Sequence, residues 1–148
     1  MSILRLWHYE LLKYLPDKQF KGQWRELIAI MHDWRDKGKT NHILINRVMN
    51  YSKNDLFNFY IKYATEYKNR YNSDKVSLKF EEFANFAGDT SIHSQIFEQW
   101  HNDDYLKICM SNLYEKHYIG IGSSRITDKE WQTLEEGYKI ITGNNYIL

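Results

Sequence analysis

The sequence predicts an all-α fold in a single compact domain of about five helices, covering residues 1–148. Apolar residues recur every three or four positions, the chain contains only one proline, and no convincing run alternates as a strand does. Residues 119–126 alone are compatible with a brief extended segment. The length suits one domain and suffices to bury a core without disulfides or metals. The lone Cys109 excludes an intrachain disulfide and indicates a reducing compartment.

The first predicted helix covers residues 16–37. Pro16 suits a first helical turn, where its missing N–H costs nothing, and Gly38 is expected to end the helix. The apolar stripe of this helix consists of Phe20, Trp24, Leu27, Ile28, Met31 and Trp34. Four charged residues are expected to lie largely off that stripe: Lys18, Lys21, Arg25 and Glu26.

Four further helices are predicted, at residues 53–71, 78–86, 103–117 and 127–142. Either Ser52 or Asn54 could cap the second helix, and Asn102 is expected to cap the fourth. The last helix opens with a capping-box pattern, in which Thr127 is followed three residues later by Glu130.

The formal net charge of +1 divides unevenly along the chain. Residues 1–72 contain 13 basic and 7 acidic residues, whereas residues 73–148 contain 7 basic and 12 acidic residues. This asymmetry predicts a basic surface that suits a polyanion, unless the two halves attract each other within the fold. No cofactor is expected, because no two of the six histidines have the three- or four-residue spacing of a helical zinc site.

One segment carries a more specific pattern. The stretch from Leu15 to Glu26, which reads Leu-Pro-Asp-Lys-Gln-Phe-Lys-Gly-Gln-Trp-Arg-Glu, resembles the corresponding segment of the pyrimidine-dimer DNA glycosylase family, of the phage endonuclease V type. That family carries an aromatic-Arg-Glu-Leu run on a helix, matched here by residues 24–27. The chain is more similar to a little-characterised branch that begins Arg-Leu-Trp-His, as at Arg5–His8, and the likeness covers roughly residues 5–117.

The resemblance implies an endonuclease V-like fold and a DNA-repair glycosylase with AP-lyase activity on damaged pyrimidines (pyrimidine dimers). Glu26 would be catalytic, and the nucleophile would be the N-terminal amine, which removal of Met1 leaves on Ser2. An α-amine has a pKa of about 7.7–8, so a useful fraction is uncharged at neutral pH and can form a Schiff base with a sugar. The partner would be damaged double-stranded DNA, with predicted contacts from Arg5, Lys18, Lys21, Arg25, Lys39 and His42.

Some positions depart from the family pattern and keep two alternatives open. The family's nucleophile directly precedes an arginine, whereas Ser2 stands three residues before Arg5, and Gln19 and Ala29 replace a histidine and an arginine. The chain could therefore be a non-catalytic nucleic-acid or nucleotide-binding protein on the same fold. A small phage protein-interaction module is the other alternative, favoured by aromatic residues that are expected to be exposed, such as Trp131 and Tyr146.

The expected setting is a cytoplasmic monomer without a membrane partner. The start of the chain lacks the apolar region of a signal peptide, and no apolar run approaches the ~20 residues that a membrane span needs.

Overall fold

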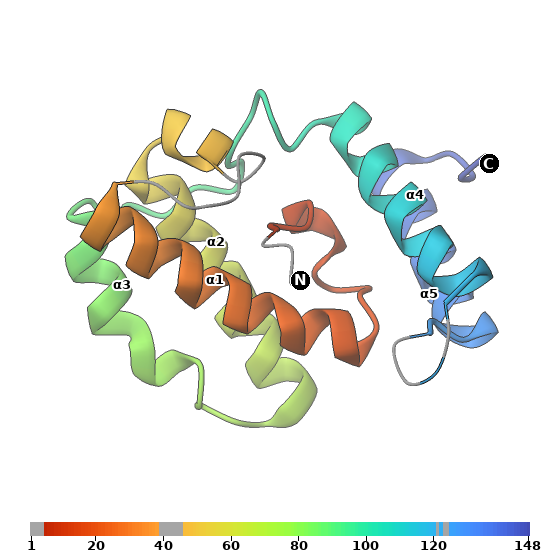
Figure 1. The fold of residues 1–148 in the computed structure, drawn as a ribbon, viewed down its shortest axis with the longest axis horizontal. Helices are drawn as coiled ribbons and strands as arrows, with labels where there is room; N and C mark the ends of the chain where they lie inside the picture. The colour runs from red at the N-terminus through yellow and green to blue at the C-terminus, as the bar shows by residue number, and fades with distance from the viewer. Residues whose placement is uncertain (1–4, 39–45, 121, 123–124) are drawn as a thin grey trace. The chain divides into compact units, whose positions relative to one another are not determined.

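The computed structural model describes residues 5–38, 46–120, 122 and 125–148. Within these ranges the regular structure consists of α-helices and short 3-10 helices, without a strand (Figure 1). The predicted all-α class is therefore confirmed. The brief extended segment considered for residues 119–126 forms no strand in its described positions.

The element bounds follow the predicted ones closely. In chain order they are η1 (Tyr9–Leu11), α1 (Asp17–Lys37), η2 (Asn46–Asn50), α2 (Lys53–Tyr71), η3 (Ser77–Lys79), α3 (Phe80–Ala87), α4 (Asp103–Tyr118) and α5 (Asp128–Thr142). Gly38 follows α1 with a φ of 69°, a left-handed conformation that glycine adopts without strain. None of the described helices combines the length and the apolar character that crossing a membrane requires.

Side-chain caps explain where three of the helices begin. Ser52 accepts a hydrogen bond from the Asp55 N–H, and Asn102 accepts one from the Tyr105 N–H. Both hydrogen bonds of the capping box join Thr127 and Glu130. Each cap satisfies an N–H that has no partner inside its helix, so the local sequence sets these helix starts.

The chain divides into two compact units. Unit 1 consists of Met1–Leu6 and Gly22–Glu98, and unit 2 consists of Trp7–Lys21 and Gln99–Leu148, so that α1 contributes to both. The charge asymmetry between the sequence halves largely disappears in this division. Unit 1 contains 12 basic and 10 acidic residues, whereas unit 2 contains 8 and 9. That the whole chain forms a single domain stays a prediction.

Unit 1 has an aromatic core that joins α1, α2 and α3. Trp24 on α1 stacks on Tyr63 of α2, with ring centroids 5.9 Å apart. Tyr60 lies parallel to Phe83 of α3 at 4.1 Å, and its hydroxyl donates to the Val76 carbonyl. Burial raises the pKa of Tyr60 to about 12, so this phenol stays protonated and keeps its donor.

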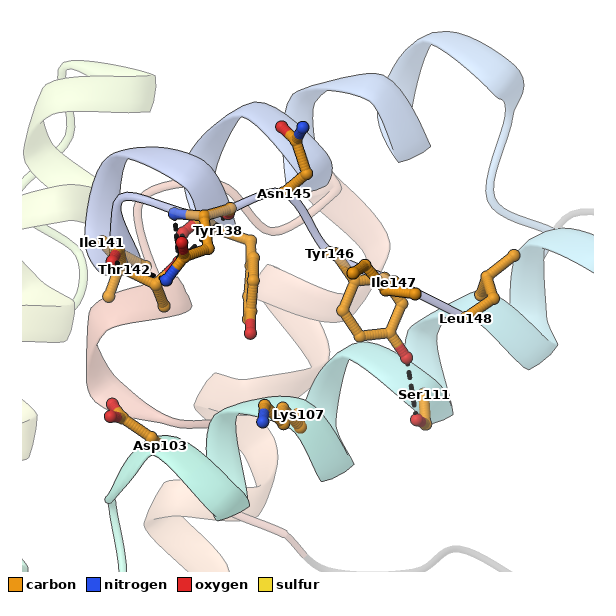
Figure 2. Close-up of a pocket in the computed structure, with 11 residues that line it drawn as sticks. Asp103, Lys107, Ser111, Tyr138, Ile141, Thr142, Asn145, Tyr146, Ile147 and Leu148 are labelled. Carbon is orange, nitrogen blue, oxygen red and sulfur yellow. Dashed lines mark hydrogen bonds between the residues drawn. The ribbon is translucent and has the colours of Figure 1, made fainter.

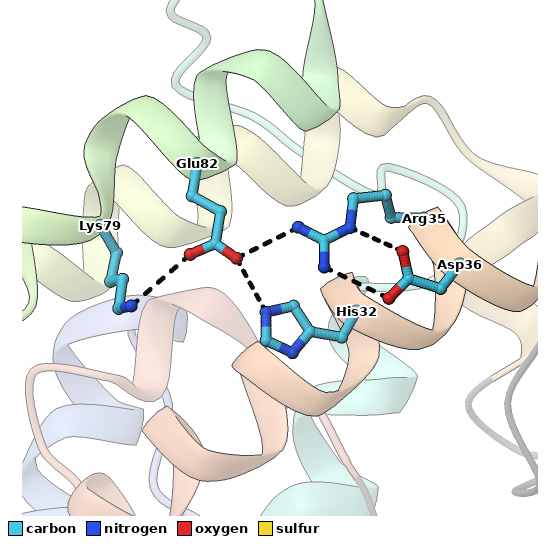
Figure 3. A network of polar contacts seen from close by, with 5 residues as sticks. All are labelled: His32, Arg35, Asp36, Lys79 and Glu82. Atoms are coloured by element: carbon cyan, nitrogen blue, oxygen red, sulfur yellow. Dashed lines mark hydrogen bonds and ion pairs between the residues drawn. The ribbon is translucent and has the colours of Figure 1, made fainter.

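A polar network also connects α1 with α3 in unit 1 (Figure 3). The Glu82 carboxylate lies 2.9 Å from the His32 imidazole, 3.1 Å from the Arg35 guanidinium and 3.6 Å from the Lys79 ammonium. Arg35 also pairs with Asp36 at 2.8 Å. The hydrogen bond from His32 and then that from Arg35 lower the pKa of Glu82. These side chains are partly exposed, so each pair contributes little to stability.

Two buried amides of α2 hold the loop that follows α3. Asn54 donates to the carbonyl oxygens of Asp89 and Ser91, and Asn58 donates to the Ser91 carbonyl oxygen at 2.9 Å. The Asn58 amide oxygen also accepts from the His93 N–H at 2.7 Å. Asn54 therefore serves this loop, whereas Ser52 caps α2.

In unit 2, α4 and α5 pack together and cover Trp131. This indole is 7% exposed, stacks on His117 at 5.8 Å and meets the edge of Tyr146 at 5.9 Å. The expectation of an exposed Trp131 is wrong, because α4 and the segment after α5 enclose its ring. Tyr146 is half-buried and pairs its hydroxyl with Ser111. This observation removes much of the support for the protein-interaction module.

Candidate functional site

The helix α1 presents Glu26 beside the core of unit 1. Leu27 is fully buried and Trp24 stacks on α2, so the rotation of this part of the helix is fixed. Successive residues are turned by about 100° in a helix, so the two positions between them face elsewhere. Arg25 is exposed and Glu26 is half-buried, which gives these neighbours different environments.

The Glu26 carboxylate binds the backbone near the start of the chain. The Arg5 N–H donates a 2.8 Å hydrogen bond to Glu26 Oε2, across 21 residues of sequence. One turn earlier on α1, Gln23 Nε2 donates a 2.7 Å hydrogen bond to the Arg5 carbonyl oxygen. We refer to Gln23, Glu26 and the Arg5 backbone as the Arg5 clamp.

The clamp restricts the orientation of the chain at Arg5. The Arg5 N–H donates to Glu26 and the Arg5 carbonyl oxygen accepts from Gln23, so α1 holds both polar groups of this backbone. A half-buried carboxylate at this position can stabilise a positive charge that develops nearby, and it can accept or return a proton.

The structure brings together only part of the predicted site. Glu26 and the Arg5 backbone meet, and Arg25 is exposed beside them in sequence. Lys18 and Lys21 are exposed in the part of α1 that belongs to unit 2. Three predicted site residues lie outside the described residues: Ser2, Lys39 and His42.

Sequence reasoning did not assign Gln23 to the site. Its side chain is only 1% exposed, although glutamine is usually a surface residue, and its donor reaches a backbone carbonyl 18 residues away. The signal that could have indicated it is the Gly22-Gln23 pair within the segment that carries the family resemblance.

Neither a metal nor a second chemical centre is evident in the described ranges. They contain no group of three or more histidine, cysteine or acidic residues that could hold a metal ion. His8 and His101 are both buried in unit 2, where their Nδ1 atoms accept the N–H groups of Glu10 and Tyr9. Their rings stack 5.2 Å apart, which suits residues that support the fold.

Unit 2 contains an open pocket of about 740 Å³ between α4, the end of α5 and the segment that follows it (Figure 2). Asp103, Lys107 and Ser111 contribute from α4, and Tyr138 and Tyr146 contribute from the opposite wall. The lining includes none of the predicted site residues. The Arg5 clamp in unit 1 therefore remains the candidate site.

Comparison with known proteins identifies a family. A family model described as pyrimidine dimer DNA glycosylase matches residues 4–78, just over half of the chain. The matched range contains Arg5, Gln23 and Glu26 together. No curated protein and no solved structure gives a significant match. The chain belongs to the pyrimidine dimer DNA glycosylase family.

Proposed function

We propose that this protein is a DNA glycosylase with AP-lyase activity that removes pyrimidine dimers from double-stranded DNA, using the Ser2 α-amine and Glu26. One observation carries the proposal: the Glu26 carboxylate holds the Arg5 backbone at 2.8 Å. Covalent geometry limits the Ser2 nitrogen to about 11 Å from the Arg5 nitrogen, because only three residues separate them. This tether allows the amine of a chain without Met1 to reach the carboxylate.

The proposed reaction assigns a separate task to each group. The uncharged amine attacks C1′ of the damaged nucleotide, the C1′–N1 bond breaks, and the base leaves with the bonding electrons. The nitrogen proton passes to the ring oxygen O4′ as the C1′–O4′ bond breaks, which opens the sugar and gives a Schiff base. Glu26 stabilises the positive charge during these steps and then accepts the C2′ proton, so that the 3′ phosphate leaves by elimination.

The basic residues are proposed as phosphate contacts. Arg25, Lys18 and Lys21 are exposed, as such a role requires, and Arg5 is half-buried. Lys39 and His42 complete the proposed set. Phosphate contacts bring affinity that falls with salt, so binding should weaken markedly between ~50 and 200 mM salt. We propose a monomer that acts in the cytoplasm on DNA.

Borohydride trapping on DNA that contains a thymine dimer or an abasic site tests the proposal. The protein should carry no N-terminal tag, and intact mass should show that Met1 is absent. We expect a covalent adduct with wild type. Ser2→Lys, whose bulky second residue should retain Met1, is expected to give much less adduct because its amine is displaced by one residue.

Glu26→Gln separates the chemistry from the positioning. A glutamine oxygen can still accept the Arg5 N–H, but it can neither take a proton nor offset a full charge. We expect strand scission to fall by about 10²–10⁴-fold while DNA affinity is kept. The matched control is Glu82→Gln, which removes one carboxylate from the same unit and should leave the rate unchanged.

Two results would overturn the proposal. One is the absence of an adduct with wild type, and the other is wild-type scission by Glu26→Gln. Salt-sensitive DNA binding without any adduct would instead favour the non-catalytic nucleic-acid binder.

A further inference from the structure

We infer that Gln23 is a positioning residue for the N-terminal nucleophile, because its amide bonds the Arg5 carbonyl and, together with Glu26, orients the Arg5 backbone to which the nucleophile is tethered. This inference rests on the proposed function. It adds a residue and a task that neither the family resemblance nor the charge pattern assigns.

The burial of Gln23 is the first argument. A side-chain amide that is 1% exposed must be hydrogen-bonded, because burying an unsatisfied polar group costs about 1–3 kcal/mol. Its Nε2 makes a short 2.7 Å bond to the Arg5 carbonyl, and the next residue, Leu6, is fully buried. The amide therefore satisfies a carbonyl at a position where water has little access.

The pairing of Gln23 with Glu26 is the second argument. They lie three residues apart on α1, a spacing that places side chains on the same helix face. One accepts from the N–H of Arg5 and the other donates to its C=O. Two bonds to opposite ends of one residue restrict its orientation more than either bond does alone.

The short distance along the chain from Arg5 to the amine makes this orientation matter. A pivot at Arg5 is transmitted through three residues, so a modest rotation displaces the amine by ångströms. A misplacement of about 1 Å can cost about 100-fold in rate. Loss of the Gln23 bond should therefore slow the chemical step. It should change DNA affinity far less, because Arg5 is the one proposed phosphate contact whose backbone Gln23 holds.

Gln23→Met is the test variant, because methionine has a similar length and volume but no N–H donor. Its matched control is Asn58→Leu, which also removes a 1%-exposed amide of unit 1 that donates to a backbone carbonyl, that of Ser91 at 2.9 Å. Both variants lose buried hydrogen bonds, and Asn58→Leu loses more of them, so both should melt at a lower temperature. Only Gln23→Met should lose the positioning.

The measurement is single-turnover borohydride trapping on abasic-site DNA, well below the melting temperature of each variant. We expect a rate at least tenfold lower for Gln23→Met with a much smaller change in the Kd for DNA, and a wild-type rate for Asn58→Leu. Gln23→Glu adds a pH profile. Its carboxyl group can donate to the Arg5 carbonyl only when protonated, so its rate relative to wild type should rise as the pH falls from 8 to 5.

Amide hydrogen exchange at Arg5 gives a readout that does not depend on catalysis. We expect the Arg5 N–H to exchange several-fold faster in Gln23→Met and at the wild-type rate in Asn58→Leu. An adduct that forms at the same rate in wild type and Gln23→Met overturns this inference and leaves the proposed function intact. Absence of an adduct in wild type overturns the proposed function and the positioning role with it.

Discussion

The buried His8 should make unit 2 sensitive to mild acid. Its imidazole is 2% exposed and accepts the Glu10 N–H at Nδ1, so it must remain neutral there. Burial lowers its pKa from 6.5 to about 4, although the hydrogen bond with the His101 backbone and the charge of Asp103 partly oppose this shift. The unfolded chain keeps the ordinary value of about 6.5.

The size of the effect follows from that difference. Between pH 6.5 and pH 4 the unfolded state binds a proton that the folded state does not, so stability falls as the pH falls through this window. Each pKa unit corresponds to 1.36 kcal/mol, which gives a loss of about 2 kcal/mol between pH 7 and pH 5. At or below pH 4 the loss approaches about 3 kcal/mol.

His8→Asn isolates this contribution, because an asparagine oxygen can still accept the Glu10 N–H but does not titrate. Urea unfolding followed by far-UV circular dichroism gives the free energy of unfolding at pH 7 and at pH 5. The packing lost in the variant lowers stability equally at both pH values. We expect wild type to lose about 2 kcal/mol more than His8→Asn between them. Parallel losses in the two proteins would refute the assignment of acid sensitivity to His8.

Three smaller changes test other parts of the fold by thermal melting. Gly137→Ala should lower stability by about 1–3 kcal/mol despite the better helix propensity of alanine, because its methyl group would overlap the Tyr14 ring, and Tyr14→Ala should relieve that cost in the double variant. An unchanged melting temperature for Gly137→Ala would contradict this packing. Thr127→Ala should cost about 1 kcal/mol by removing the cap on Glu130, whereas a loss within error would show that the capping box contributes nothing. Glu82→Gln should change stability by less than about 1 kcal/mol, with the difference shrinking in salt, and a larger, salt-independent loss would show that the network is more than a surface ion pair.

Helix positions were predictable because their signals are local. Asn102 and Thr127 lie directly before the helices that they cap, and the apolar stripes repeat with the helical period. The third helix begins two residues later than predicted, at Phe80, because η3 takes up the preceding turn. Such a 3-10 turn has nearly the same sequence preferences as the first turn of an α-helix.

Long-range contacts were not predictable in this way. Glu26 was predicted as a site residue through a family resemblance, but no local pattern pairs Gln23 with a carbonyl 18 residues away. Trp131 was expected to be exposed, because the sequence of its own helix does not show that His117 and Tyr146 cover its ring. The charge difference between residues 1–72 and 73–148 likewise did not predict the charge of the folded units, because each unit combines separate stretches of the chain.

The Arg5 clamp holds main-chain atoms, and this has a consequence for sequence variation. Every residue type except proline has both an N–H and a C=O in its backbone. The hydrogen bonds from Gln23 and to Glu26 therefore do not depend on which side chain stands at position 5. Related sequences can therefore carry other residues at position 5 and keep both hydrogen bonds. A proline there would remove the N–H that donates to Glu26. An insertion or deletion between residues 2 and 5 would leave the Arg5 clamp intact and change only the number of residues between the clamp and residue 2.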